Sequence, residues 1–247
     1  MKHLGGSRKY MHVFYLRFRE NLEFPLDLLA TWAGLPFTMI TYYFLYGIIF
    51  QYNPSFANTT FPVLLVYFFL TLCFRRMGNH SGIANDINDS IQKGNFIAFL
   101  ARPIHYVGYF FASRSTKAII QGLMALPFVI LVPIFVIPGF AFNGVAYVQA
   151  FILAYLGFLV AFQIFYIVGL LTFWFEEIWG FRHMVGTINW LFSGAIIPIS
   201  ILAAPLQLIA FILPFQHQAA IPAQLILGQK TTADFFISAI INSDSCF

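Results

Sequence analysis

Charged residues are scarce in this sequence, and so are cysteines. Only 9% of its 247 residues are charged and 60% are hydrophobic, whereas soluble domains are typically about 25% charged. Mean hydropathy is +0.80. So few charges cannot cover a soluble core of this length, which excludes an ordinary soluble domain. The two cysteines, Cys73 and Cys246, are too far apart to form a metal-binding or redox motif.

Catalytic motifs are missing as well. The sequence has no G-x-x-x-x-G-K-[ST] loop for nucleotide phosphates, and its six histidines form no H-E-x-x-H motif. Ser193 and Ser200, in a late apolar run, stand outside any G-x-S-x-G pattern. No charged residue lies clearly at the middle of the first five apolar runs, which disfavours an ion-coupled carrier. We therefore predict no catalytic residue, no cofactor and no metal site.

Long apolar runs are what the sequence does contain, and they predict an all-α, polytopic membrane protein with about six transmembrane helices. The first four predicted spans are residues 26–50, 61–77, 106–137 and 148–173. A fifth run, 184–213, is interrupted by Pro198 and Pro205, which predicts a span that breaks near its outer end and continues as a short dipping helix. The last run, 233–241, is too short to cross a bilayer, so the sixth span is expected to be incomplete.

The N-terminal segment, 1–24, alternates basic and apolar residues and lacks the apolar core of a signal peptide. Its basic residues include Arg8, Lys9, Arg17 and Arg19, and its apolar side chains on one helical side are Met11, Phe14, Tyr15 and Phe18. This pattern predicts an interfacial amphipathic helix whose arginines extend away from the apolar side. A partly disordered basic tail is the alternative.

A polar segment, 79–105, separates the second and third spans. Ile83, Ile87 and Ile91 recur every four residues, which predicts one apolar stripe on a short helix. The opposite face carries Asn85, Asp86, Asn88 and Asp89. Gly94 is placed to end the helix. We expect the isoleucines to bind a groove on a soluble partner; a solvated loop is the alternative.

Basic residues are distributed unevenly between the two sides of the predicted membrane. If the N-terminus is cytoplasmic, every lysine and arginine except Lys230 lies on the cytoplasmic side. The positive-inside rule therefore predicts that orientation. It also places the segment 79–105 in the same compartment as two adjacent carboxylates, Glu176 and Glu177.

Three stretches carry a resemblance to a known family. They are GNFIAFLARPIHY, LLTFWFEEIWGFRHMVGTINWLFSGAIIPISILAAPL and LPFQHQAAIPAQLILGQ. The second contains an F-W-x-E-E-x-x-G pattern that continues into S-G-x-x-I-P. In their order and in the basic-residue topology, these stretches resemble the membrane subunit of a type-2 ATP-binding-cassette (ABC) exporter, the ABC-2 family.

The resemblance implies a single transmembrane permease domain over 1–247, with 1–24 as interfacial helix and 79–105 as cytoplasmic coupling loop. ATP hydrolysis would occur in a separate ATPase subunit and drive export through this chain. The other implied partners are a second permease chain, identical or related, and membrane lipids, with no nucleic acid. The implied location is the bacterial inner membrane.

The residues singled out for these roles fall into three groups. The ATPase-coupling residues are Ile83, Asp86, Ile87, Ile91, Arg102 and Pro103; the acidic pair is Glu176 and Glu177; and the broken-helix region contains Pro198 and Pro205. Two other functions stay open. A lipid-modifying membrane enzyme would have to use Glu176, Glu177, Arg182 and His183, and a non-transporting scaffold would need no such site. The sequence identifies no substrate.

Overall fold

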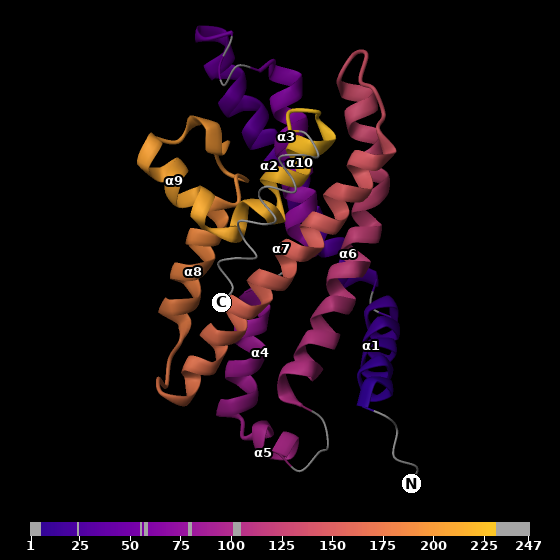
Figure 1. Ribbon diagram of the computed structural model, residues 1–247, viewed down its shortest axis with the longest axis vertical. Coiled ribbons are helices and arrows are strands. Elements are labelled where there is room, and N and C mark those ends of the chain that lie inside the picture. Colours follow the sequence, from indigo (N-terminus) through magenta and orange to yellow (C-terminus); the bar gives the residue numbers. More distant parts are fainter. Residues whose placement is uncertain are drawn as a thin grey trace.

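The computed structural model describes residues 6–23, 25–54, 56, 59–78, 81–100 and 105–230, and in this part of the chain every regular element is a helix. Figure 1 shows long helices that run along one common direction, with short helices at both ends. The α-helices are α1 (Gly6–Glu23), α2 (Pro25–Tyr52), α3 (Phe61–Met77), α4 (Ser81–Gln92), α5 (Asn95–Leu100), α6 (Tyr106–Val136), α7 (Gly144–Leu170), α8 (Trp179–Phe192), α9 (Ala204–Ile212) and α10 (Ala220–Ile226). The short 3-10 helices are η2 (Leu171–Phe173), η3 (Ile199–Ile201) and η4 (Pro214–Gln218).

Four helical stretches among the described residues are long and apolar enough to cross a membrane, and they correspond to the first four predicted spans. They begin at Ala30, Phe61, Tyr106 and Gly144. By contrast, α8 has 14 residues, fewer than the roughly 20 that a spanning helix needs. The predicted sixth span, 233–241, lies outside the described residues. The chain is thus a multi-pass helical protein with four candidate spans in its described part.

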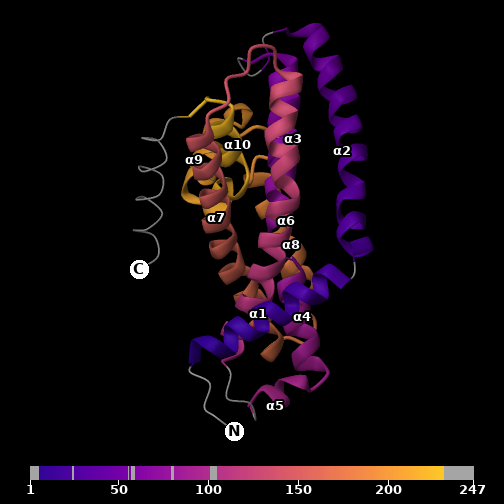
Figure 2. The same cartoon turned by 90° about the vertical axis from the view of Figure 1, so that its right-hand side faces the viewer.

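The core forms around α3. Phe68, Leu70 and Phe74 of this helix are fully buried, and α3 packs against α2, α6, α7 and α10. In contrast, α2 lies along one edge of the bundle in Figure 2, and large apolar side chains such as Phe37 are mostly exposed. An apolar surface of this kind suits contact with lipid.

Charge separates the two ends of the bundle. The stretches 28–74, 118–175 and 183–229 contain no Asp, Glu, Lys or Arg. We call the end formed by α1, α4, α5 and the adjoining ends of α3, α6, α7 and α8 the charged end; it lies at the bottom of Figure 1. The opposite end, with α9 and α10, is the weakly charged end, where Lys230 follows α10.

The N-terminal segment is helical, as predicted, and α1 packs against α6. Met11 is 70% exposed. The prediction that the arginines extend away is wrong for Arg17, which donates to the Tyr109 hydroxyl at 2.5 Å and pairs with Glu20 at 2.5 Å. Burial of the guanidinium lowers its pKa. The interactions with Tyr109 and Glu20 raise the pKa by more than that, so the pKa of Arg17 is above its usual value.

Candidate functional site

The predicted helix in the polar segment exists as α4. It spans Ser81–Gln92, and the chain turns away at Gly94, whose φ is 70°. Glycine has no Cβ to oppose this left-handed conformation, so it ends helices readily. The apolar period and the glycine together therefore identified the helix and its end correctly.

The isoleucine stripe of α4 faces the inside of this chain. Ile83 and Ile87 are 0% exposed and belong to a core cluster with residues of α7 such as Phe165. The contact with α7 is close at Gly169, where an added Cβ would lie 2.9 Å from the Ile87 Cβ. The prediction that the isoleucines bind a groove on a soluble partner is therefore wrong for Ile83 and Ile87. Periodicity shows which face of a helix is apolar, but it does not show which surface covers that face.

Polar contacts attach α4 to its neighbours as well. Arg114 of α6 donates to the Gly82 carbonyl at 2.7 Å and pairs with the Asp86 carboxylate. On another side, the Thr172 hydroxyl of η2 donates to Asn88 Oδ1 at 3.0 Å. These contacts fix α4 to α6 and to the end of α7.

Two further hydrogen bonds reach the segment that follows η2. The Gln92 side-chain amide donates to the Glu176 carbonyl at 2.6 Å, and the Arg182 guanidinium of α8 donates to Asn85 Oδ1. Residues of α6, α7, η2 and α8 therefore hold α4 in place. A displacement of α4 must act on all of them.

The outer face of α4 is polar. Asn85, Asp86 and Asp89 are exposed, and Lys93 pairs with Asp89 at 2.7 Å across one helical turn. An exposed pair of this spacing adds little to stability. Asp89 is therefore accessible to a partner, whereas Asn85 and Asp86 already bind Arg182 and Arg114.

The tip of the charged end carries an apolar residue that the sequence analysis did not single out. Ile97 of α5 is 71% exposed. Its neighbour Phe96 turns inward, with ring centroids 5.1 Å from Tyr106 and from Phe173. Phe96 and Phe99 both pack on Tyr106 of this chain, and these two aromatic residues close to Ile97 were the sequence signal for an outward isoleucine.

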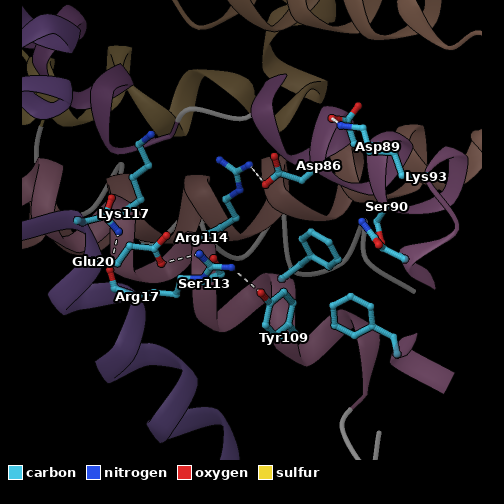
Figure 3. Close-up of a pocket in the computed structure, with 14 residues that line it drawn as sticks. Arg17, Glu20, Asp86, Asp89, Ser90, Lys93, Tyr109, Ser113, Arg114 and Lys117 are labelled. Atoms are coloured by element: carbon cyan, nitrogen blue, oxygen red, sulfur yellow. Dashed lines mark hydrogen bonds and ion pairs between the residues drawn. The ribbon is translucent and has the colours of Figure 1, made fainter. Parts of the chain in front are cut away.

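A cleft of about 520 Å³ opens beside α4 at this end. It is lined by α1, α4, α5 and α6, and Figure 3 shows acidic and basic side chains from these helices that point into it. The side chains labelled in Figure 3, charged and uncharged together, are Arg17, Glu20, Asp86, Asp89, Ser90, Lys93, Tyr109, Ser113, Arg114 and Lys117. A cleft with both signs of charge suits a polar protein segment. In the described part of the chain, no group of three or more His, Cys, Asp or Glu could hold a metal ion.

The other predicted site residues do not converge on one chemistry. Glu176 and Glu177 are exposed, and neither carboxylate has a hydrogen-bond or ion-pair partner among the described residues. Arg182 turns toward Asn85 instead. Arg102 and Pro103 lie outside the described residues. An interfacial catalytic cluster is thus not assembled from these side chains.

The fifth apolar run breaks after α8. The helix ends at Phe192, and Gly194 has a φ of 75°. Pro198 follows this break, whereas Pro205 lies in the first turn of α9. The glycine, not the prolines, therefore sits where the helix ends.

Three tyrosine hydroxyls satisfy the backbone carbonyls that the break sets free. They come from α2 and α3: Tyr67 donates to Gly194 at 3.0 Å, Tyr42 to Ala195 at 2.8 Å, and Tyr46 to Ile196 at 3.1 Å. A carbonyl left unpaired in an apolar setting is costly. We call these three contacts the tyrosine clasp; it holds the broken segment against α2 and α3.

Arg75 adds a polar contact at the same place. Its guanidinium donates to Ser193 Oγ at 2.7 Å, and the Ser193 hydroxyl in turn donates to the Trp190 carbonyl at 2.9 Å. The last turn of α3 is therefore joined to the last turn of α8.

A comparison with known protein families identifies the family of this chain. The model of the family described as "ABC-2 family transporter protein" matches residues 37–243, a range that includes α4, α8 and the break. A search of curated proteins found no match. The family match covers most of the chain, and the long helices are apolar enough to cross a membrane. The chain therefore belongs to the ABC-2 transporter family and is a multi-pass transmembrane permease.

Proposed function

We propose that this chain is the membrane subunit of an ATP-driven exporter and that α4 receives the movement of a separate ATPase. The observation that carries the proposal is the position of α4. Its inner face packs on α7 through Ile87, and Arg114 of α6 and Arg182 of α8 bind it at Gly82 and at Asn85. Its outer face is exposed and polar. A helix with these two faces can bind a partner on one side and pass force to the spans on the other.

The buried isoleucines supply the rigidity that this role needs. Full burial of an isoleucine side chain is worth about 1.5–3 kcal/mol. Ile83 and Ile87 are both buried completely, so α4 does not leave α7 easily. In this proposal, Ile83 and Ile87 transmit movement, while Ile91, Arg102 and Pro103 keep their predicted place in the coupling segment.

The ATPase contact is formed by the outer face of α4 and the tip of α5. Asp89 provides charge, and Ile97 provides an apolar side chain that can enter a groove on the ATPase. The exposed carboxylates of Glu176 and Glu177 lie at the same end and extend the contact surface.

The charged end faces the cytoplasm of a bacterial cell in this proposal, and the chain lies in the inner membrane. The unequal distribution of lysine and arginine supports this orientation, because every basic residue except Lys230 belongs to that side. A second permease chain, identical or related, would complete the pathway. Lys2 and Lys93 would then both be cytoplasmic.

The test is copurification of the ATPase encoded with this chain. Ile97→Asp places a charge in the proposed apolar contact, and we expect at least a tenfold loss of bound ATPase, which corresponds to about 1.4 kcal/mol. Asn95→Asp adds the same charge to the same short helix at another exposed position and serves as the control. Equal ATPase recovery by both variants would contradict the assigned contact.

A further inference from the structure

A second cavity lies between α2, α3 and α8, with Phe165 of α7 in its wall. Its volume is about 650 Å³. Four basic side chains line it: Arg75, Arg76, Arg182 and His183. The remaining lining residues are apolar or uncharged, and they include Thr31 and Thr38 of α2. The cavity is separate from the cleft beside α4, because Arg114 and Asp86 line only that cleft.

The positive charge of this cavity is not neutralised by the described residues. No Asp or Glu lines it. Arg75 hydrogen-bonds to Ser193, and Arg182 to Asn85 and to the ring Nε2 of His183, and none of these partners is negatively charged. The carboxylates in ion pairs at this end are bound to other bases, as Asp86 is to Arg114. Arginines grouped beside an apolar bundle without a counter-charge favour the binding of an anion.

A buried amide in the cavity wall provides an independent indication of a ligand. Asn189 is 3% exposed, and its Oδ1 atom has no hydrogen-bond partner among the described residues. Buried side-chain acceptors are usually paired, and an unpaired one calls for an explanation. This oxygen has almost no accessible surface, so a hydroxyl on a bound molecule, such as that of a protonated phosphate, would supply the missing donor once the wall opens.

The surroundings of the cavity are apolar on the side of α2 and α8. Phe37 of α2 is 74% exposed and Trp190 of α8 is 45% exposed. Figure 2 shows α2 along the edge of the bundle. A hydrocarbon chain attached to an anionic group could therefore extend from the basic cavity onto apolar side chains.

We propose that this cavity binds the anionic phosphate-monoester headgroup of an amphipathic molecule, which is the class of substrate that the exporter carries. The inference rests on the proposed exporter function. Guanidinium groups bind phosphate oxygens through paired, charge-assisted hydrogen bonds, so Arg76 and Arg182 hold the phosphate. Arg75 holds it from the side of Ser193, which places the headgroup next to the break after α8.

Native mass spectrometry of the purified full-length chain in neutral detergent tests the proposal. The probes are a short-chain phosphatidic acid, the phosphatidylcholine with the same acyl chains, and inorganic phosphate. We expect phosphatidic acid to bind, and the other two to remain unbound at the same concentration. Equal binding of the two lipids would overturn the anionic site. Binding of inorganic phosphate as tight as that of phosphatidic acid would overturn an amphipathic ligand.

The key variant is Arg76→Gln, because Arg76 has no ion pair within the described residues. We expect it to weaken phosphatidic acid binding roughly tenfold, which corresponds to the loss of about one strong charge-assisted contact. Lys117→Gln removes one positive charge from the cleft beside α4 and should leave lipid binding unchanged. If both variants bind equally well, the cavity is not the site.

A second variant is chosen so that the chain still folds. Arg182 also contacts α4, so we replace it by lysine, which retains the charge. We expect the affinity of Arg182→Lys for phosphatidic acid to lie between that of the wild type and that of Arg76→Gln. All of these measurements are made without the ATPase. A failure to bind lipid would therefore leave the exporter proposal intact, and a failure of the Ile97 test would leave the lipid site intact.

Discussion

The charged end and the tyrosine clasp satisfy polar groups in opposite ways. Around α4, guanidinium, carboxylate and amide side chains bind one another at the edge of the bundle, as Arg114 does with Asp86. At the break after α8, the stretch 183–229 has no charged residue, and tyrosine hydroxyls bind the free carbonyls. Tyrosine suits this place because its ring packs in an apolar setting while its hydroxyl donates a hydrogen bond. Around α4 the contacts are mostly between charged groups, whereas at the break neutral hydroxyls bind the carbonyls and Arg75 is the charged donor beside them.

The two regions share a connecting element, α8. Near its start, Arg182 binds Asn85 of α4; just past its end, Ser193 binds Arg75 of α3 and Gly194 enters the tyrosine clasp. Its 14 residues correspond to about 21 Å. In the proposed mechanism, a movement that the ATPase imposes on α4 reaches the break through this single helix.

Ile87→Asp should have the largest effect on stability. It tests whether Ile87 is buried within this chain or is free to bind a partner. Loss of a buried isoleucine side chain costs about 2–5 kcal/mol, and the buried carboxylate adds a desolvation cost. We expect a large fall in the thermal unfolding temperature in detergent. The control is Ile97→Asp, at a position that is 71% exposed, which should unfold as the wild type does. Equal unfolding temperatures for the two variants would mean that α4 does not pack on α7.

Gly169→Ala tests the same contact from the side of α7. The new Cβ would lie 2.9 Å from the Ile87 side chain, so α4 must shift outward, at a cost of about 1–3 kcal/mol. Gly180→Ala is the matched control, because an added Cβ there meets nothing within 4 Å. We expect transport to fall for the first variant alone. Normal transport by both would show that a shifted α4 still couples.

Tyr67→Phe should have a smaller effect and addresses the other region. It removes the donor to the Gly194 carbonyl, which would remain buried and unpaired at a cost of about 1–3 kcal/mol. Tyr43→Phe removes a hydroxyl from a tyrosine that is 54% exposed and should change little. Hydrogen exchange of the segment after α8 measures the result, with faster exchange expected for Tyr67→Phe only. If exchange is equally slow in both, the clasp does not hold this segment.

Local patterns in the sequence predicted local structure well. The four-residue period of the isoleucines and Gly94 identified α4, and hydropathy identified the first four candidate spans. The prolines indicated that the fifth run is interrupted, but the helix ends before them, at Phe192. Gly194 follows at once, and a glycine accepts the positive φ of 75° that a helix end commonly requires.

Contacts between distant parts of the chain were beyond the sequence. The hydroxyl of Tyr42 binds a carbonyl 153 residues away, and no periodicity encodes such a pair. The same limit explains the isoleucine stripe, since the α7 surface that covers Ile87 is far along the chain. Arg17 was misassigned for this reason too, because its partner Tyr109 lies 92 residues later.

The central claim is that α4 and the end of α7 move as one unit, and a reversible cross-link tests it most directly. The side-chain oxygens of Asn88 and Thr172 are 3.0 Å apart, so Asn88→Cys with Thr172→Cys places two thiols in reach of each other. The native Cys73 is buried, and Cys246→Ser removes the other native cysteine. With the ATPase and ATP present, we predict the same transport rate for the oxidised and the reduced protein. Transport that is lost on oxidation and restored by reduction would show that α4 has to slide along α7, which contradicts the account.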